Sequence, residues 1–385
     1  MKILRLLRNT PNISQLPTYA HLRSPPVAVT PAVLRQMTMK ASLPHEERTA
    51  AEPRQNRLYS VRLSHIDQAN PTVRLLQLAI PPPSSEESRD DSRGDEQSDQ
   101  EQPFTFLPGQ WLDVHIPFVT KAGGFSITST PADARVLPSP ESTEALGTEE
   151  PGIAEMETRG RRPYVELAVQ EAPSNPAGAW LWKPQDEILG KELCIRVGGS
   201  FVWPPPSGIN VREIRNVVLI AGGMGINPLI SILSHLNNND PSFPIPPSSL
   251  NINILYTTRL PKGLSATEAP PETILDQILF LPRLRQIMRA QSHARRLRIS
   301  VELFITDLPE HSPLVAAPPP DLIIHSRRIK RQDLQAAVVG EDALVNPKDS
   351  VCYLCGPPRM TDEFVDEMRG LLGGETERVL FEKWW

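Results

Sequence analysis

The sequence predicts an α+β protein of two domains, an antiparallel β-barrel followed by an α/β domain with a parallel sheet. Two observations indicate this fold class. Short strand-like segments separated by glycine and proline fill much of the first half of the chain, with little helical periodicity between them. From Arg215 onward, apolar strand-like runs alternate with segments of helical periodicity, which is typical of a parallel sheet covered by helices.

The first domain is expected over residues 55–212, with a boundary near 207–213. Its strand-like segments lie between glycine and proline turns. Two acidic, polar insertions, residues 81–102 and 132–162, carry too little apolar surface to offset the entropy of ordering them, so we expect both to be disordered. The expected strands are Tyr59–Leu63, Val73–Ile80, a strand within Phe104–Pro117, Phe125–Thr130, Tyr164–Gln170 and Glu192–Val197.

The second domain is expected over residues 213–385. Its first strand, Val217–Ala221, is apolar without alternation, which indicates burial on both faces. Further strands are expected at Asn251–Thr257, Ser300–Thr306 and Val351–Leu354, and helices at Leu229–Leu236, Thr273–Ala290 and Pro358–Leu372.

The first fifty or so residues differ in composition from the rest of the chain. Several arginines and lysines precede the first acidic residue, Glu46, and serine, threonine and proline fill the gaps. This pattern is typical of a mitochondrial transit peptide, and the alternative is a disordered tail. We therefore exclude residues 1–50 from the fold and expect a mitochondrial protein, located in the matrix.

Composition excludes several classes of protein. A net charge of -5 and a pI near 6.0 argue against binding nucleic acid, because nucleic-acid-binding faces are strongly basic. No apolar stretch is long enough for a transmembrane segment. Three cysteines do not make a disulfide framework.

A glycine-rich turn follows the strand Val217–Ala221. Gly222, Gly223 and Gly225 allow a tight turn and close approach of a ligand, and Pro228 suits the first turn of a helix. Free N–H groups at such a helix start favour a phosphate, so the turn is a candidate dinucleotide site. The usual fingerprint has a third glycine where this chain has Pro228. A glycine turn without a ligand is the alternative.

Six motifs, taken in order, resemble the ferredoxin–NADP reductase superfamily. The resemblance covers residues 57–385 and implies a six-stranded flavin-type β-barrel followed by a Rossmann-like nucleotide-binding domain. The motifs are Phe106-Leu-Pro-Gly-Gln-Trp111, Phe125-Ser-Ile-Thr-Ser-Thr-Pro131, Arg196-Val-Gly-Gly-Ser-Phe201, Leu219-Ile-Ala-Gly-Gly-Met-Gly-Ile-Asn-Pro228, Cys355-Gly-Pro-Pro-Arg-Met360 and Phe381-Glu-Lys-Trp-Trp385.

The resemblance also implies a role for each matching residue. Ser126, Cys355 and Glu382 would be catalytic: the Ser126 hydroxyl would bond flavin N5 and Cys355 would lie near nicotinamide C4. Glu382 could relay a proton to the flavin, or it could simply be a partner for Lys383 or Arg359. Trp384 or Trp385 would cover the flavin ring. The flavin residues would be Phe125, Ser126, Thr128, Gly178, Ala179 and Trp180, and those for the nicotinamide cofactor Gly222, Gly223, Met224, Gly225, Ile226, Asn227, Pro228, Arg259, Cys355, Gly356, Pro357 and Met360.

The chain departs from the family pattern at the flavin phosphate. Gly123 stands where the family has an arginine, and this loss removes a bidentate phosphate partner. Phe125 replaces a tyrosine. The flavin could therefore be FAD, FMN or absent. Lys121 and Arg135 are nearby cations that could substitute, or they could simply be solvated.

Two further features bear on the cofactors. Cys352 and Cys355 form a C-x-x-C, but Cys194 is the only other cysteine, so we expect no metal; Cys352 should be core and Cys355 should lie in the turn after the strand. Arg259 ends the second strand of the nucleotide domain, where a basic residue favours a 2′-phosphate and so NADP(H). The resemblance favours NAD(H), which we expect while leaving the choice open.

These observations predict a mitochondrial flavin-dependent NAD(P)H oxidoreductase that passes hydride from nicotinamide to flavin and electrons to an unknown acceptor. That acceptor could be a separate protein. The alternative is a degenerate reductase that binds NAD(P)H without stable flavin and acts as a nucleotide-responsive binding protein.

Overall fold

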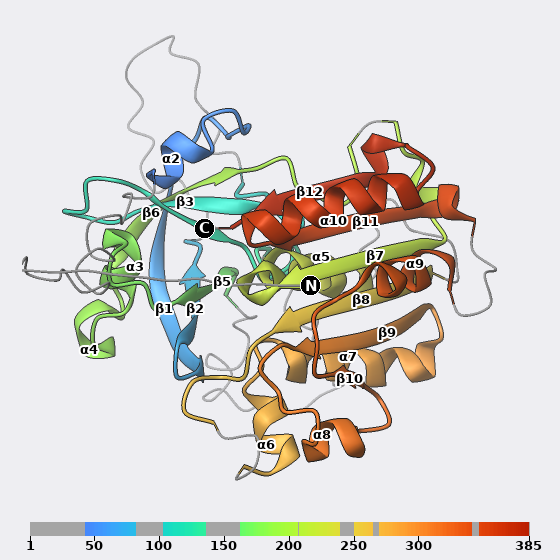
Figure 1. Cartoon of the computed structure of the whole chain (residues 1–385). Helices are drawn as coiled ribbons and strands as arrows, with labels where there is room; N and C mark the ends of the chain where they lie inside the picture. The colour runs from blue at the N-terminus through green and yellow to red at the C-terminus, as the bar shows by residue number, and fades with distance from the viewer. Residues whose placement is uncertain are drawn as a thin grey trace, which may run out of the picture. The chain divides into compact units, whose positions relative to one another are not determined.

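The computed structural model describes residues 43–81, 103–135, 162–206, 208–238, 250–264, 269–340 and 346–384. Leu43 to Trp385 form one compact unit (Figure 1). The sequence analysis excluded residues up to about 50, but the described part begins earlier, and the short helix α2, His45–Arg48, contacts strand β4 of the barrel. Most of the two acidic insertions and the proposed transit peptide lie outside the described residues.

The first sheet has six strands joined entirely by antiparallel pairs in the order β4-β3-β6-β1-β2-β5. An isolated bridge from Ile127, just after β4, to Leu167 in β5 brings the two edges together, as a barrel requires. Alternating apolar side chains fill the interior. The strands are β1 (Tyr59–Asn70), β2 (Val73–Ala79), β3 (Trp111–His115), β4 (Gly123–Ser126), β5 (Tyr164–Gln170) and β6 (Glu192–Gly198), and helices α3 (Pro176–Leu181) and α4 (Gln185–Ile188) follow β5.

The second sheet is parallel, in the order β10-β9-β8-β7-β11-β12. Strands β7 and β11 are buried throughout, as the unbroken apolar run of β7 predicts. The α+β class with a barrel and a parallel sheet is thus confirmed. The strands are β7 (Asn216–Gly222), β8 (Leu250–Thr258), β9 (Leu297–Ile305), β10 (Ile323–His325), β11 (Ser350–Gly356) and β12 (Val379–Lys383).

Helices cover both faces of the parallel sheet. One core contains apolar residues of α5, α6 and α7, and a separate core contains those of α9 and α10. The helices are α5 (Ile226–Asn238), α6 (Pro271–Asp276), α7 (Leu281–Ala294), α8 (Pro313–Ala316), α9 (Arg331–Val339) and α10 (Pro358–Leu371). Single 3-10 turns are η1 (Val211–Glu213), η2 (Gly223–Gly225), η3 (Pro347–Asp349) and η4 (Thr376–Arg378).

The prediction of one helix over Thr273–Ala290 is wrong. The chain forms α6 and then α7, and between them Phe280 adopts a left-handed backbone with φ of 60°. Pro282 lies in the first turn of α7, where its missing N–H costs nothing, whereas within a continuous helix it would break a hydrogen bond. Strand β10, helix α9 and strand β12 were not predicted.

The barrel and the parallel sheet share a packed boundary. Val73 and Ala168 of the barrel belong to the same core cluster as α5 and α7. The buried Asn227 amide donates to the Ala168 carbonyl at 3.1 Å, and the Ser231 hydroxyl donates to the Ser129 carbonyl at 2.7 Å. These buried polar contacts fix the start of α5 against the barrel.

Candidate functional site

The glycine turn after β7 is required by its neighbours. A Cβ at Gly222 would lie 2.8 Å from the Met360 sulfur, and a Cβ at Gly225 would overlap the carbonyl oxygen of Cys355. Gly223 has φ of +55°, which side chains rarely adopt. The turn therefore packs directly on β11 and α10 at the end of the sheet.

A cleft of about 670 Å³, here called the dinucleotide cleft, lies at the carboxyl ends of the parallel strands. Gly222, Gly223 and Met224 line one side of it, and Pro357 and Met360 belong to the same wall. The barrel contributes residues from β1, β2 and β5. Because the strand order reverses at β7, with β8 on one side and β11 on the other, the cleft stands where ligands bind in open α/β sheets.

The wall formed by the loop after β8 carries the positive charge of the cleft. Arg259 and Lys262 are both exposed there. The loop is held by Asp307, whose carboxylate accepts from the Leu260 N–H at 2.8 Å. Two cations and the threonines of β8 suit an anionic ligand with sugar hydroxyls.

The predicted dinucleotide residues divide into two groups. Gly225, Ile226 and Pro228 are buried and do not line the cleft, so they position the turn rather than face a ligand. Asn227 is buried too, and its Oδ1 has no hydrogen-bond partner within the described ranges. Gly356 is likewise buried in β11.

Trp384 covers the glycine turn. Its indole N–H donates to the Gly222 carbonyl at 2.8 Å, and its ring would lie 3.2 Å from a Cβ on Gly223. Its backbone N–H donates to the carbonyl of Gly356. The ring thus forms part of the dinucleotide cleft. Trp385, the other predicted aromatic, lies outside the described residues.

Cys355 and Glu382 stand opposite each other in the β11–β12 pair. Burial, and then the charge of Glu52, raises the pKa of Glu382 to about 8, and its Oε2 atom is buried without a described hydrogen-bond partner. Burial, and then the charge of Glu382, raises the pKa of Cys355 well above its ordinary value. At neutral pH both groups therefore keep their protons, which makes Cys355 a poor nucleophile.

The expected position of Cys355 in a turn is wrong, because β11 continues to Gly356 and keeps Cys355 in the strand. Cys352 and Cys355 are both buried and contribute to different cores. Three residues apart in a strand, their side chains point to opposite faces. Within the described ranges, no three His, Cys, Asp or Glu side chains gather as a metal site would require.

The residues of the predicted flavin motif lie in the barrel and differ from one another in burial. Phe125 is partly buried against the barrel core, and Ser126 stands opposite Trp111 in the β3–β4 pair. Thr128 is fully buried, and its hydroxyl donates to the Glu166 carboxylate at 2.8 Å. The Thr128 hydroxyl is therefore already hydrogen-bonded within the protein.

The space beside Gly123, where the family has its arginine, is filled. A Cβ at Gly123 would lie 2.6 Å from both the Ala177 Cβ and the Phe125 ring. Helix α3 carries the predicted residues Gly178, Ala179 and Trp180. At its start the Asn175 side chain accepts from the N–H groups of Ala177 and Gly178. These N–H groups are thus already hydrogen-bonded.

The two cations suggested as replacements stand elsewhere. Lys121 is exposed and pairs with Glu47 at 3.4 Å. Arg135 lines a small pocket with Phe104 and Pro131.

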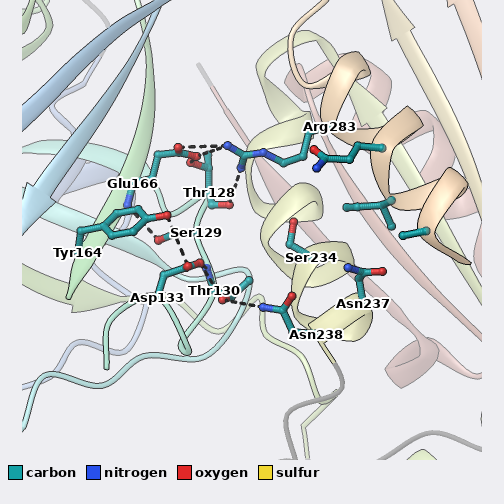
Figure 2. A pocket seen from close by; sticks show the side chains of 13 residues that line it. Thr128, Ser129, Thr130, Asp133, Tyr164, Glu166, Ser234, Asn237, Asn238 and Arg283 are labelled. Atoms are coloured by element: carbon teal, nitrogen blue, oxygen red, sulfur yellow. Dashed lines mark hydrogen bonds and ion pairs between the residues drawn. The ribbon is translucent and has the colours of Figure 1, made fainter. Parts of the chain in front are cut away.

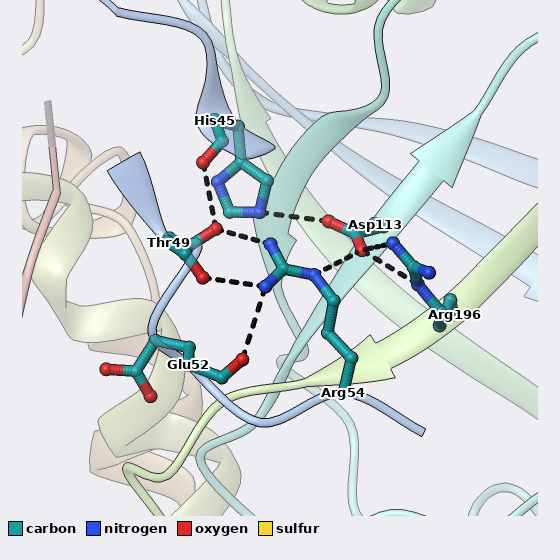
Figure 3. A network of polar contacts seen from close by, with 6 residues as sticks. All are labelled: His45, Thr49, Glu52, Arg54, Asp113 and Arg196. Atoms are coloured by element: carbon teal, nitrogen blue, oxygen red, sulfur yellow. Dashed lines mark hydrogen bonds and ion pairs between the residues drawn. The ribbon is translucent and has the colours of Figure 1, made fainter. Parts of the chain in front are cut away.

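A buried ionic network that the sequence analysis missed joins strands β3 and β6 to residues that precede β1 (Figure 3). Asp113 of β3 is fully buried and accepts from Arg54 at 2.9 Å and from Arg196 at 2.8 Å, while His45 Nε2 lies 3.2 Å away. Burial alone would raise the pKa of Asp113, but these hydrogen bonds outweigh it and hold that pKa well below its ordinary value.

The network seats residues 45–54, here called the N-terminal segment, on the barrel. The His45 ring fills the space that a Cβ at Gly124 would occupy, and it meets Trp111 edge to face. Glu52, from the same segment, accepts from Ser200 at 2.7 Å. The only sequence signal for this network is an aspartate inside an otherwise apolar strand.

The fold and the cleft together define a class: a two-domain protein with the architecture of ferredoxin–NADP reductase-like proteins. A ferredoxin NADP⁺ reductase from Neisseria gonorrhoeae, solved with bound FAD and NADP, aligns with 86% of this chain and 100% of its own, with a TM-score of 0.51 and 12% identity. The cytochrome b5 reductase domain of Ulva prolifera nitrate reductase aligns with 85% of this chain and 97% of its own, with a TM-score of 0.50 and 16% identity.

Particular homologues share nearly the whole chain. The chain is 29% identical over 352 residues to Oxidoreductase NAD-binding domain-containing protein 1 of Danio rerio, covering 91% of this chain and 100% of that protein. It is 26% identical to the Homo sapiens protein of the same name, covering 93% of this chain and 91% of that protein. The resemblance expected from the six motifs is confirmed. No family model matches the chain.

One finding concerns membranes. None of the helices within the described ranges is both long and apolar enough to span a bilayer.

Proposed function

We propose that this chain is a mitochondrial NAD(P)H-dependent oxidoreductase that binds its nicotinamide dinucleotide in the dinucleotide cleft. The observation that carries the proposal is that cleft: a glycine turn and helix start on one wall, and Arg259 and Lys262 on another. The names of the homologues, which contain "NAD-binding domain", support it.

The residues around the cleft would have different roles in binding and catalysis. Backbone N–H groups of the turn would hold the pyrophosphate, and Arg259 and Lys262 would add charge at the other end. Trp384 covers the turn and would shield the nicotinamide end from water. Glu382, protonated at neutral pH, would hold a proton close to Cys355.

A flavin in the barrel fits only in part. Phe125 and Ser126 are present for the ring end. The phosphate end does not fit, because Ala177 and the Phe125 ring fill the position beside Gly123 and Asn175 already bonds the first N–H groups of α3. We therefore assign no reaction step to a flavin, and a retained FAD or FMN would need another phosphate partner.

This misfit favours a second candidate function. In it the chain binds NAD(P)H without stable flavin and acts as a nucleotide-responsive binding protein. The closed position beside Gly123 is the specific observation in its favour. The two functions differ in one measurable property, the retention of flavin.

An absorbance spectrum of the purified full chain tests both functions. The protein is incubated with FAD or FMN, freed of unbound flavin, and treated anaerobically with NADH or NADPH. Bound flavin that bleaches supports the oxidoreductase. No bound flavin, together with NADH binding by fluorescence, supports the second function. Absence of binding by both NADH and NADPH contradicts both.

A matched pair of glycine variants places the nucleotide. Gly223 and Gly373 both have positive φ, but only Gly223 lines the cleft. Both alanine variants should lose similar stability through backbone strain. Only Gly223→Ala should weaken NADH binding, by about tenfold, since it moves the turn by which the pyrophosphate is held. Equal affinities in the two variants would place the nucleotide elsewhere.

The choice of nucleotide, the location and the acceptor complete the proposal. We expect NAD(H), although Arg259 also suits a 2′-phosphate. We propose a separate protein as electron acceptor.

Mitochondrial import is tested by fusing residues 1–42 to a fluorescent reporter. A diffuse reporter would contradict import, and a variant with its arginines changed to glutamine serves as the control.

A further inference from the structure

A second cleft, with a volume of about 460 Å³, lies between the barrel and helices α5 and α7 (Figure 2). Its barrel side is formed by residues 128–133 with Tyr164 and Glu166. Its helix side is formed by residues of α5, such as Ser234, and of α7, such as Arg283. It shares no lining residue with the dinucleotide cleft. Thr128, which the sequence analysis assigned to the flavin, lies in its wall, but none of the roles given under the proposed function uses this cleft.

The walls of this second cleft are fixed by contacts that cross the domain boundary. Arg283 donates to both carboxylate oxygens of Glu166, at 2.9 and 3.1 Å. Asn238 donates to the Thr130 hydroxyl at 3.3 Å. Small-molecule sites are usually formed before the ligand arrives and commonly lie at domain boundaries. The geometry here meets both conditions.

The charges inside the second cleft argue against an anionic ligand. The guanidinium of Arg283 is neutralised by Glu166, which it contacts with two hydrogen bonds. The remaining charged group is Asp133, whose Oδ2 accepts from the N–H and the hydroxyl of Thr130, both at 2.8 Å. A phosphate would thus meet a carboxylate and no unpaired cation in the lining.

The rest of the lining consists mainly of side chains that can both donate and accept hydrogen bonds. Hydroxyl groups of serine, threonine and tyrosine and side-chain amides of asparagine and glutamine dominate it. Ile287 and Ala290 add a small apolar surface, and Tyr164 adds a ring. This combination suits a molecule with many hydroxyl groups and some C–H surface, because each hydroxyl both donates and accepts.

Ser234 supplies an independent observation. Its hydroxyl oxygen is shielded from solvent and has no hydrogen-bond partner among the described residues. Such groups are rare, since a buried hydroxyl left without a partner destabilises the fold. Figure 2 shows Ser234 on the helix side of the cleft, together with Asn237 and Asn238. A ligand hydroxyl would satisfy it once the side chain turned toward the cleft that Ser234 lines.

We propose that the second cleft binds a neutral polyhydroxylated molecule, a sugar or a sugar alcohol. Ser234, Asn237 and Asn238 would contact it from α5, and Asp133 and Tyr164 from the barrel. Because the ligand would touch both domains, its binding would stabilise their boundary in addition to the Arg283–Glu166 pair.

Ligand-observed NMR and calorimetry on the full chain test this site, with D-glucose, myo-inositol and maltose as probes. At least one probe should bind with a Kd below about 1 mM. Ser234→Leu, which fills the cleft, should weaken that binding at least tenfold, whereas Ser292→Leu, at an exposed position of α7 outside the cleft, should not. Gln286→Trp narrows the cleft from an exposed rim position and serves if Ser234→Leu does not fold.

Three outcomes would overturn the proposal. The first is that none of the three probes binds. The second is that binding survives unchanged in both Ser234→Leu and Gln286→Trp, because the probe then sits elsewhere. The third is that inorganic phosphate or spermidine binds in a Ser234-dependent way while the neutral probes do not. None of these outcomes depends on flavin or NADH, so the test is separate from that of the proposed function.

Discussion

The dinucleotide cleft and the flavin-phosphate position of the barrel differ in whether they leave space for the expected ligand. Gly222 and Gly223 border the open space of the cleft, although the Cβ positions of Gly222 and Gly225 are themselves filled by Met360 and by the Cys355 carbonyl oxygen. At Gly123 the loss of a side chain has not left space, because Ala177 and Phe125 occupy it. A glycine is therefore not by itself evidence of a ligand site, and the open cleft beside Gly222 and Gly223 is what distinguishes the two regions.

The largest effect is expected on the barrel side, at Asp113. Asp113→Ala removes the shared partner of Arg54, Arg196 and His45 and leaves two partly buried arginines without a counter-charge. We expect a loss of about 3–5 kcal/mol in the free energy of unfolding, measured by urea denaturation. Asp186→Ala, at an exposed site in α4, should change it by under about 1 kcal/mol. A similar loss in both variants would contradict a structural role for the network.

The second-largest effect is expected at the glycine turn beside the dinucleotide cleft. Gly225→Ala would place a Cβ against the Cys355 carbonyl oxygen, so backbone must move. We expect a destabilisation of about 3 kcal/mol by thermal or urea unfolding. Gly370→Ala in α10, where nothing lies within 4 Å, should instead stabilise by about 0.5–1 kcal/mol. If Gly225→Ala is as well tolerated as Gly370→Ala, the turn does not need its close approach.

A smaller effect depends on pH. The pKa of Glu382 is raised to about 8 in the folded chain, above roughly 4.3 in the unfolded chain. The contribution of this carboxyl to the free energy of unfolding is therefore fully present below about pH 4. It falls as the pH rises towards 8, because the folded state resists ionising the carboxyl. Glu382→Gln should raise Tm by about 2–4 °C at pH 9 and by almost nothing at pH 4. A gain that is equal at both pH values would contradict the buried titration.

The smallest effect distinguishes the two nucleotides. Arg259→Ala should weaken NADPH binding by about fivefold if its guanidinium contacts the 2′-phosphate, because an exposed ionic contact contributes about 1 kcal/mol. NADH binding should change by less than about twofold. Fluorescence titration of both nucleotides measures this. Equal losses for the two would mean that Arg259 contacts the pyrophosphate or the loop itself.

The sequence predicted well those features that depend on local pattern. The unbroken apolar run of β7 and the glycines after it indicated a buried parallel strand and a tight turn, and the structure has both. Cys352 was correctly expected in the core. These features could be predicted because their cause lies within a few residues of one another.

Features that depend on distant partners could not be predicted. Asp113 bonds Arg54 and Arg196, which are 59 and 83 residues away. Strand β12 is defined by its parallel pairing with β11, and the three-residue β10 only by β9. The space at Gly123 is decided by Ala177, more than fifty residues later. In each case the tertiary neighbour, which no local pattern encodes, determines the result.

The position of His45 restricts where the N-terminus could be trimmed. A cut near residue 50 would remove the imidazole that contacts Asp113 and fills the space beside Gly124. A cut before Leu43 would leave the whole N-terminal segment in place. If the chain is matured by proteolysis, as proposed, a cut before His45 keeps the imidazole beside Asp113 of strand β3, whereas a cut after it removes that contact.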